Sequence, residues 1–180
     1  ARLESDDVGE DDAAARTAQA IAGPNIDAAA PFTGRCNLYA TVSGLLQIDR
    51  ARIDQLNAID EAVTVATINP GDAVAAGQLV ATVKVIPFAI STATIEKWAN
   101  AMADAPSPVS IALFEEHAAG LLLTHLPGTK SSILDKTAKT IEARLSALGS
   151  RLAESRRCSH EVEAIALALA DLAGADCDPI

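Results

Sequence analysis

Aromatic residues are scarce in this 180-residue chain, where Phe, Trp and Tyr together make up 3% of the sequence. Ala, Leu, Val and Ile supply most of the 49% hydrophobic content, which is enough apolar mass for a core and argues against disorder as the main state. Aliphatic cores are typical of helices packed on sheets rather than of aromatic-rich β-sandwiches. The composition therefore favours a mixed α and β protein.

Cysteines and long apolar runs are also lacking. Cys36, Cys158 and Cys177 are odd in number and widely spaced, so they predict neither a disulfide framework nor a paired CxxC metal site. No apolar run approaches the roughly 18 residues of a membrane span, and the N-terminal stretch lacks the basic region and apolar core of a signal peptide. These absences predict a cytoplasmic protein without a membrane partner.

Positive charge is in the minority, with 14 Lys and Arg against 24 Asp and Glu and a formal net charge of -10. An acidic surplus repels phosphate backbones, and no basic stripe interleaved with aromatic residues stands out. The charge balance therefore argues against nucleic acid as a partner.

The first part of the chain predicts an α+β module over residues 1–105. Acidic residues ahead of an Ala-rich run predict a helix over residues 10–22. The runs LYATVSGLLQID, AVTVATI and QLVATVKVIPFAI predict strands, and RARIDQLNAIDEA between them has the spacing of a short helix. The run STATIEKWANAM predicts another helix with Ser91 as its N-cap, and ADAPSPV then interrupts the pattern. We place the domain boundary there, at about Pro106.

The second part, residues 106–180, predicts an α/β domain. VSIAL and GLLLTHL read as strands, and apolar residues spaced four, three, four and three apart predict a helix over residues 131–148. A second strand in RLAESRRC, a helix over residues 159–173 with Ser159 as N-cap, and a third strand entered at CDPI complete the pattern. Strands alternating with helices predict a parallel sheet with right-handed crossovers. Because the chain stops at that third strand, we expect this domain to be C-terminally incomplete.

The junction LPGTKSSILDKT carries the candidate site of the second domain. In open parallel sheets, ligands bind beyond the carboxyl ends of the strands, where helix N-termini expose unpaired N–H groups. The residues placed there are Gly128, Thr129, Lys130, Ser131 and Ser132, which suit an anion such as phosphate. The alternative is a capped strand-to-helix turn. Asp135, one turn into the helix, either faces the same mouth or stabilises the positive end of the helix dipole.

Several longer stretches together resemble a known family. PFTGRCNLYA, GQLVATVKVIPFA, LPGTKSSILDKT, LSALGSRLAESRRCSHEVEAIALALADLAG and CDPI are similar to the molybdopterin-binding domain of molybdenum cofactor biosynthesis proteins, preceded by the N-terminal α+β module of some bacterial members. Asp135-Lys136-Thr137 matches the Asp-Ser-Asn position of that family. The resemblance implies a three-layer parallel-sheet fold for the second domain.

The resemblance also implies a function. Members bind the dithiolene-pterin phosphate of the molybdenum cofactor, and active members adenylylate it or insert molybdate with Mg and a nucleotide. For this chain it implies molybdopterin binding at the junction, Asp135 as the catalytic residue, no resident metal, and a homo-oligomer. The sequence leaves open whether the chain is an adenylyltransferase, a molybdate-insertion protein, a non-catalytic binding or protein-interaction module on a degenerate fold, or a regulator that senses the cofactor.

Several other polar residues have a structural role as the alternative to a functional one. Arg35 offers a fork of donors to a phosphate and Asn37 can read a pterin edge, but Arg35 also has many acids with which to pair. His125 lies beside the junction, where a half-buried histidine is the commoner role. His160 follows Cys158 and Ser159 without further metal ligands at suitable spacing. Trp98, on an apolar helix stripe, is expected in the core.

Overall fold

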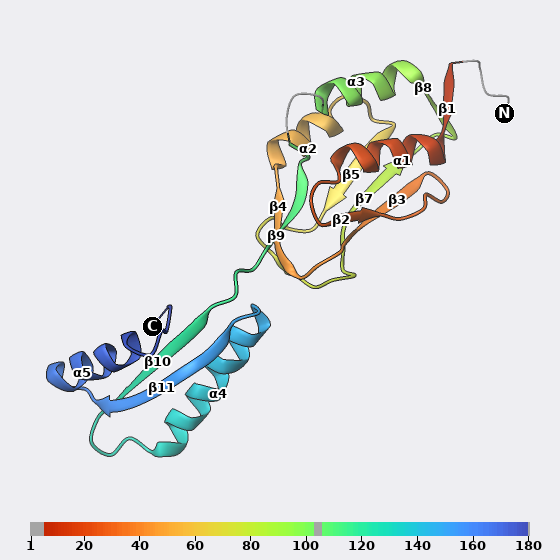
Figure 1. The fold of residues 1–180 in the computed structure, drawn as a ribbon. Coiled ribbons are helices and arrows are strands. Elements are labelled where there is room, and N and C mark those ends of the chain that lie inside the picture. Colours follow the sequence, from red (N-terminus) through yellow and green to blue (C-terminus); the bar gives the residue numbers. More distant parts are fainter. Residues whose placement is uncertain (1–5, 103–105, 180) are drawn as a thin grey trace. The chain divides into compact units, whose positions relative to one another are not determined.

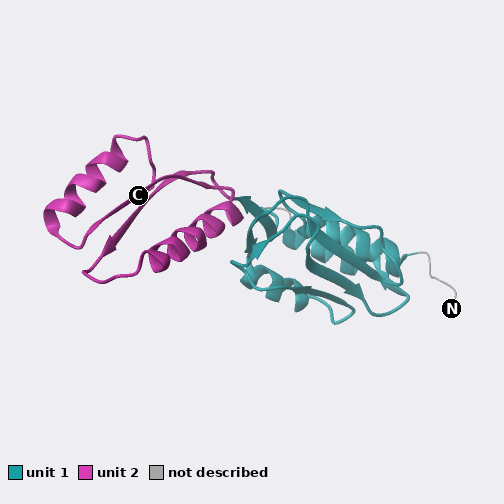
Figure 2. Cartoon of the chain, turned by 90° about the horizontal axis from the view of Figure 1, so that it is seen from below, with its two compact units in different colours: residues 1–113 teal, residues 114–180 magenta. Residues whose placement is uncertain are grey.

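The computed structural model describes residues 6–102 and 106–179, and the chain divides into two compact units, residues 1–113 and 114–180. Figure 2 colours the two units separately. The division falls later than the expected boundary at Pro106 because the strand Val109–Leu113 pairs with Gly44–Ile48 of the first unit. A proline-rich break marks a loop in the sequence, but it does not determine whether the strand after the loop belongs to the preceding or to the following domain.

Unit 1 contains nine strands and three helices among its described residues, labelled in Figure 1. The strands are β1 (Asp7–Gly9), β2 (Ile26–Ala28), β3 (Arg35–Ala40), β4 (Gly44–Ile48), β5 (Val63–Thr67), β6 (Ala73–Val74), β7 (Leu79–Val85), β8 (Ala89–Ser91) and β9 (Val109–Leu113). The helices are α1 (Glu10–Ile21), α2 (Arg50–Asn57) and α3 (Thr92–Met102). The three predicted helices are confirmed, with small shifts at their ends, and AVTVATI contains β5. The runs LYATVSGLLQID and QLVATVKVIPFAI, each expected as one strand, are each divided by a turn, into β3 and β4 and into β7 and β8.

The larger sheet of unit 1 is antiparallel and has the strand order β2-β3-β7-β5. Helix α1 packs against β3 and β7, as Figure 1 shows. Side chains alternate across this sheet, so that Cys36 and Leu38 of β3 and Val83 and Val85 of β7 are buried, while their neighbours are less buried. Buried and less buried residues alternate in this way when one face of a sheet packs on the core and the other faces solvent.

A second sheet, of order β6-β4-β9, is also antiparallel. Its centre depends on Gly44, because a Cβ atom built there would lie 2.3 Å from the carbonyl oxygen of Ala112. Beyond β9, the backbone N–H of Gly23 donates to Val109 O at 2.8 Å and Ile111 N donates to Pro24 O at 3.1 Å. The segment after α1 therefore covers the outer edge of β9.

Two of the three helices of unit 1 start with a side-chain cap, one of which the sequence predicted. The Ser91 hydroxyl accepts a hydrogen bond from Thr94 N at 3.3 Å, which confirms Ser91 as a cap of α3. Asp49 caps α2 in the same way, since its carboxylate accepts from Arg52 N at 3.1 Å. No helix among residues 6–102 and 106–179 has the length and apolar character needed to cross a membrane.

Asp60 lies in the segment that follows α2, and its carboxylate links this segment to α3. Its carboxylate accepts hydrogen bonds from Ala62 N at 3.0 Å and from the Thr94 hydroxyl at 2.9 Å. The bond from the Ala62 backbone, followed by the one from Thr94, holds the pKa of Asp60 below its usual value. A carboxyl whose pKa is lower in the folded state stabilises the fold above its unfolded pKa of about 4, and this stabilisation disappears as the pH falls through the folded value.

Asp60→Asn is accordingly expected to lower the free energy of unfolding of unit 1 by about 1 kcal/mol at pH 7, and by less at pH 3. Urea unfolding at the two pH values measures the difference. Asp54→Asn, on the exposed face of α2, is the control. Equal losses for Asp60→Asn at both pH values would contradict the assignment.

Unit 2 consists of β10 (Ala118–His125), α4 (Ser131–Ala147), β11 (Arg151–Ser159) and α5 (Val162–Ala173). The strands β10 and β11 are parallel, from Ala118 opposite Arg151 to His125 opposite Ser159, as the alternation of strands and helices predicted. The helices α4 and α5 flank the strand pair on two sides (Figures 1 and 2). The fold class is thus mixed α and β.

Two predictions for unit 2 are corrected. The segment entered at CDPI, as far as it is described, forms an isolated antiparallel bridge between Asp178 and Ala118 rather than a third parallel strand. Ser159 is the last residue of β11 and does not cap α5, which begins after Glu161 without a side-chain cap. Most strand pairs of the described chain are antiparallel, so the three-layer parallel sheet is not confirmed.

The core of unit 2 is small. Its buried apolar residues are Ala119, Leu123, Ala168, Leu172 and Cys177. None of the residues of α4 is fully buried. Of the predicted apolar stripe, Leu134, Ala138, Ile141 and Leu145 are half-buried and Leu148 is exposed. Helix α5 therefore contributes more to this core than α4 does. Its Leu172 is the large aliphatic side chain of unit 2 that is fully buried.

Candidate functional site

The strand-to-helix junction of unit 2 lies where the sequence placed the candidate site. β10 ends at His125, and the loop turns with Thr129 N donating to Leu126 O at 3.1 Å. Gly128 has a φ of +85° and open space around its Cα, so its backbone conformation rather than crowding requires glycine. Helix α4 then starts at Ser131 after Lys130, with no side-chain cap. Within its first turn, Ile133 N donates to Lys130 O at 3.0 Å, whereas the N–H groups of Ser131 and Ser132 precede the first intrahelical hydrogen bonds and are left for another acceptor.

The parallel pairing brings a second histidine to this junction. Because His125 is opposite Ser159 in the register of β10 and β11, His160 follows directly beside it. His160 N donates to His125 O at 3.1 Å, and His160 Nδ1 shares a hydrogen bond of 3.0 Å with the Thr124 hydroxyl. Two imidazoles and a hydroxyl therefore meet at the carboxyl ends of the strands.

A hollow of about 310 Å³ opens at this position. It is lined by Thr124, His125, Leu126, Thr129 and His160. This volume is at the lower end of the range for small-molecule pockets, about 300–1,000 Å³. The imidazole and hydroxyl groups can each donate a hydrogen bond, which suits an oxyanion such as a phosphate group.

The predicted residues take different places around this hollow. Thr129 lines it, and Gly128 forms the turn that leads to it. Lys130, Ser131 and Ser132 are exposed at the start of α4 and do not line it. His160 was missed as a site residue because the sequence placed it in the first turn of a helix over residues 159–173, whereas it lies directly after β11 and before α5.

Asp135 has a partner of its own. Its carboxylate accepts a hydrogen bond of 2.7 Å from Arg157 Nη2 on β11, with the two side chains 52% and 39% exposed. Asp135 does not line the hollow. The carboxylate therefore connects α4 to β11, whereas the sequence allowed it either to face the mouth or to stabilise the helix end.

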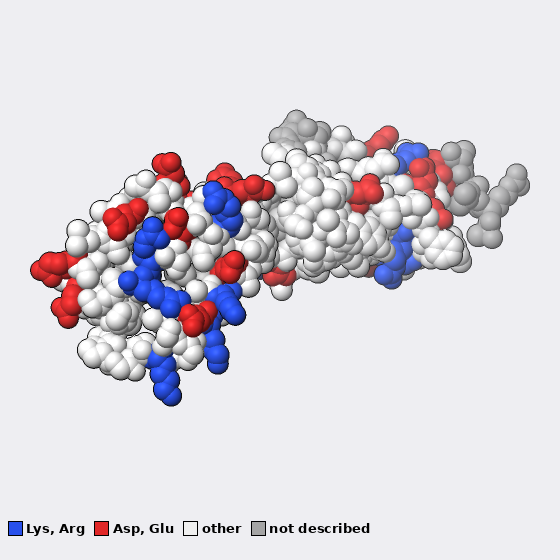
Figure 3. Space-filling view, turned by 60° about the horizontal axis from the view of Figure 1, so that its bottom comes forward, with Lys and Arg blue, Asp and Glu red and all other residues white. Residues whose placement is uncertain are grey.

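Basic residues concentrate around this part of unit 2. The segment from Lys130 to Arg157 contains seven Lys or Arg and three Asp or Glu, although the whole chain has a net charge of -10. Figure 3 shows Lys and Arg side chains gathered on one face of this unit. Such a local surplus attracts anions in spite of the opposite net charge, because nearby charges dominate a screened potential.

Arg35 and Asn37 belong to β3 in unit 1, whereas the loop residues belong to unit 2. The Asn37 side chain bonds within its sheet: its Oδ1 accepts from the Thr82 hydroxyl at 3.0 Å and its Nδ2 donates to the Tyr39 hydroxyl at 3.3 Å. Arg35 is exposed and lies opposite Lys84 in the strand register. Of these two residues, Arg35 has its charged group available to an anion.

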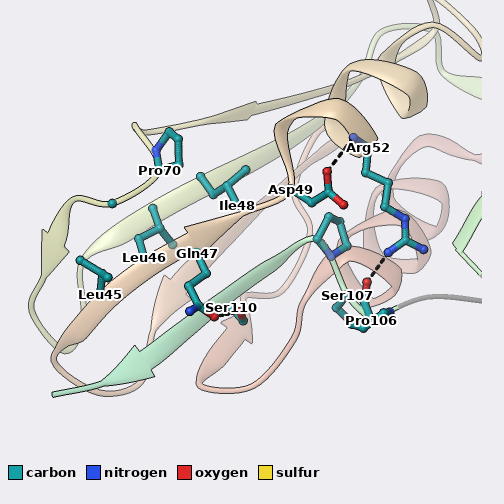
Figure 4. A pocket seen from close by; sticks show the side chains of 12 residues that line it. Leu45, Leu46, Gln47, Ile48, Asp49, Arg52, Pro70, Pro106, Ser107 and Ser110 are labelled. Atoms are coloured by element: carbon teal, nitrogen blue, oxygen red, sulfur yellow. Dashed lines mark hydrogen bonds between the residues drawn. The ribbon is translucent and has the colours of Figure 1, made fainter. Parts of the chain in front are cut away.

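A larger hollow, of about 620 Å³, lies in unit 1 along β4 (Figure 4). The Arg52 guanidinium, its lining cation, donates to the carbonyl oxygen of Pro106, and Asp49 accepts from Arg52 N. The Ser110 hydroxyl donates to Gln47 Oε1 at 3.3 Å. Because these polar groups already bond to one another, this hollow is the weaker candidate for an ionic ligand.

Neither a metal-binding cluster among the described residues nor a related protein provides further evidence on this site. Among the described residues, His, Cys, Asp and Glu do not gather in groups of three or more that could hold a metal ion. Comparison of the chain with protein families, curated proteins and solved structures found no match.

Proposed function

We propose that the chain binds molybdopterin and that the phosphate of the pterin lies at the carboxyl ends of β10 and β11. The observation that carries the proposal is the hollow lined by Thr129, His125 and His160 beside the uncapped start of α4. In this proposal, unit 2 has the three-layer parallel-sheet architecture of the molybdopterin-binding domain, which the sequence resembles.

The donors at the junction fit a phosphate. A phosphate group presents several acceptor oxygens and negative charge, and hydrogen bonds to a charged acceptor are stronger than neutral ones. Thr129 and the two imidazoles donate from the walls of the hollow. The N–H groups of Ser131 and Ser132 at the start of α4 add the positive end of a helix dipole, and Lys130 adds a full charge.

The size of the hollow fits the phosphate and the part of the ligand next to it, rather than the whole pterin. At about 310 Å³ the hollow provides one end of an extended site. The tricyclic pterin then extends over the neighbouring surface, where the basic segment from Lys130 to Arg157 attracts an anionic ligand.

The ion pair of Asp135 favours a second candidate function, a non-catalytic molybdopterin-binding module. A catalytic carboxylate must hold a metal ion or a proton at the reacting group, but Asp135 accepts from Arg157 at 2.7 Å. For the catalytic alternative, adenylylation or molybdate insertion with Mg and a nucleotide, this pair has to open when the ligands bind. Asp135→Asn separates the two candidates, since it abolishes turnover in an enzyme and leaves binding by a module largely intact.

The test is a binding measurement on the whole chain. The purified protein is oxidised and searched for a fluorescent pterin product, and molybdopterin is then titrated into the wild type and into Thr129→Val. We expect saturable binding that Thr129→Val weakens at least tenfold, equivalent to about 1.4 kcal/mol, because the variant removes a donor while keeping the shape of the side chain.

Thr140→Val is the matched control, because Thr140 also lies in unit 2 and its hydroxyl donates to Lys136 O within α4, away from the hollow. The same titration with Mg and ATP present tests for adenylylation. If the wild type shows no saturable binding, or if Thr129→Val and Thr140→Val bind alike, the proposed site is wrong.

A further inference from the structure

Three large apolar side chains are exposed at one end of unit 1. Phe32, Ile86 and Phe88 are 75%, 63% and 78% exposed. Phe32 precedes the turn into β3, and Ile86 and Phe88 lie in the connection from β7 to β8. Figure 1 shows these two connections and the start of α1 at the same end of the unit. Large apolar side chains that gather on a surface indicate an interaction site.

The strand register places two cations beside this apolar cluster. Phe32 and Arg35 exchange backbone hydrogen bonds of 2.9 and 3.1 Å, so their side chains lie on the same face of the sheet. Arg35 is opposite Lys84 on β7, and Ile86 continues that pairing, because its N–H donates to Ala62 O at 2.8 Å. Since side chains alternate along a strand, Arg35, Lys84 and Ile86 share the face that α1 does not cover.

Carboxylates lie on the other side of the cluster, at the start of α1. Glu10 N donates to Phe88 O at 2.9 Å, and a Cβ atom built on Gly34 would lie 2.9 Å from Glu10 Oε2. Asp11 Oδ1 accepts a hydrogen bond from Gly34 N at 2.7 Å. The apolar cluster is therefore bordered by cations on the uncovered face of the sheet and by carboxylates on the side of α1.

The charges on the two sides do not pair within the chain. The three ion pairs of the described residues join other side chains, and the Lys84 ammonium donates to the carbonyl oxygen of Thr33. A surface with an apolar centre and opposite charges on its two sides is self-complementary, because a two-fold axis through the centre places the cations of each copy over the carboxylates of the other. An anionic lipid surface fits less well, since it would repel Glu10 and Asp11.

We propose that this end of unit 1 binds a second copy of the chain in a two-fold symmetric dimer. Phe32, Ile86 and Phe88 of the two copies pack together, and Arg35 of each copy faces Glu10 of the other. Three apolar side chains from each copy make an interface smaller than the standard one of about 1,600 Å², so the dimer dissociates at micromolar concentrations. The interface lies in unit 1 and is independent of the molybdopterin proposal for unit 2.

Sedimentation velocity of the full chain tests the proposal, at concentrations from about 1 μM to about 500 μM, which cover the affinities of weak interfaces. We expect a reversible equilibrium between monomer and dimer. Phe32→Ser removes an aromatic anchor and is expected to weaken the dimer at least tenfold. Leu113→Ser is the matched control, because Leu113 is also 63% exposed but lies on β9 in the other sheet, and this variant should dimerise as the wild type does.

The opposite charges are tested by exchanging their signs. Arg35→Glu and Glu10→Lys are each expected to weaken the dimer at least tenfold, because like charges then face each other twice across the two-fold axis. In an equimolar mixture of these two variants both contacts again join opposite charges, so we expect dimers at the affinity of the wild type. Circular dichroism of each variant alone checks that unit 1 is folded.

Three outcomes of sedimentation would overturn the proposal. They are a wild type that stays monomeric over the whole range, equal dimerisation by Phe32→Ser and the wild type, and a mixture of Arg35→Glu and Glu10→Lys that dimerises no better than either variant alone. Co-sedimentation with vesicles of phosphatidylserine and phosphatidylcholine adds a fourth. A monomeric chain that binds these vesicles, and loses that binding in Phe32→Ser, would assign the apolar cluster to a lipid surface instead.

Discussion

Leu172→Ala is expected to unfold unit 2 while unit 1 stays folded. Leu172 is fully buried on α5, in a core that otherwise contains mainly small side chains, such as Ala119 and Ala168. Removing a buried leucine side chain typically costs about 3 kcal/mol, from lost burial and the cavity that remains. A small core provides few other contacts to offset this loss, so the change is a large part of the stability of the unit.

Hydrogen exchange measured segment by segment separates the two units. We expect β10, β11, α4 and α5 to lose protection in Leu172→Ala, while β3 and β7 of unit 1 keep theirs. Leu167→Ala on the same helix is the matched control, because Leu167 is 70% exposed and its loss should hardly change protection. Equal effects of the two variants would show that the core of unit 2 is not centred on Leu172.

Gly44→Val is expected to lower the free energy of unfolding of unit 1 by about 3 kcal/mol. The first atom of any side chain at residue 44 would lie 2.3 Å from Ala112 O and 2.6 Å from Ile111 Cγ2. The nearer atom belongs to the backbone of β9, which is paired with β4 along its whole length, so the two strands would have to separate. Overpacking that displaces a paired backbone is more damaging than overpacking against a flexible side chain.

Chemical denaturation monitored by circular dichroism measures this loss. Gly9→Ala is the control, because Gly9 has an ordinary extended φ of -61° and no neighbouring atom within 4 Å of an added Cβ. A Gly44→Val variant as stable as Gly9→Ala would mean that β4 and β9 are not paired in the register described.

Local patterns in the sequence predicted most of the elements. The acidic start and Ala-rich run of α1, the Ser91 cap of α3 and the apolar spacing of α4 are local signals, and each gave its helix to within a residue or two. The strand ends and partners were harder to predict. β9 was assigned to the second domain because its pairing with β4 is set by contacts between distant residues, which no local period records.

The same limit applies to the candidate site. Pro127 and Gly128 marked the turn, and the expected parallel sheet placed Thr129 at the correct edge. His160 comes to the hollow because β11 ends at Ser159, opposite His125. The sequence placed His160 in the following helix instead, because the start of α5 has no side-chain cap to mark it. The partner of Asp135 was unpredictable in the same way, since Arg157 is 22 residues away in sequence.

The arginines of β11 have a second consequence, for self-association. Among the described residues β11 pairs only with β10, so its other edge presents backbone donors and acceptors that could template a strand of another molecule. Arg151, Glu154, Arg156 and Arg157 interrupt this strand with charge, and charged side chains on an edge oppose such pairing. The residues that make unit 2 attractive to anions thereby also act as gatekeepers against edge-to-edge aggregation.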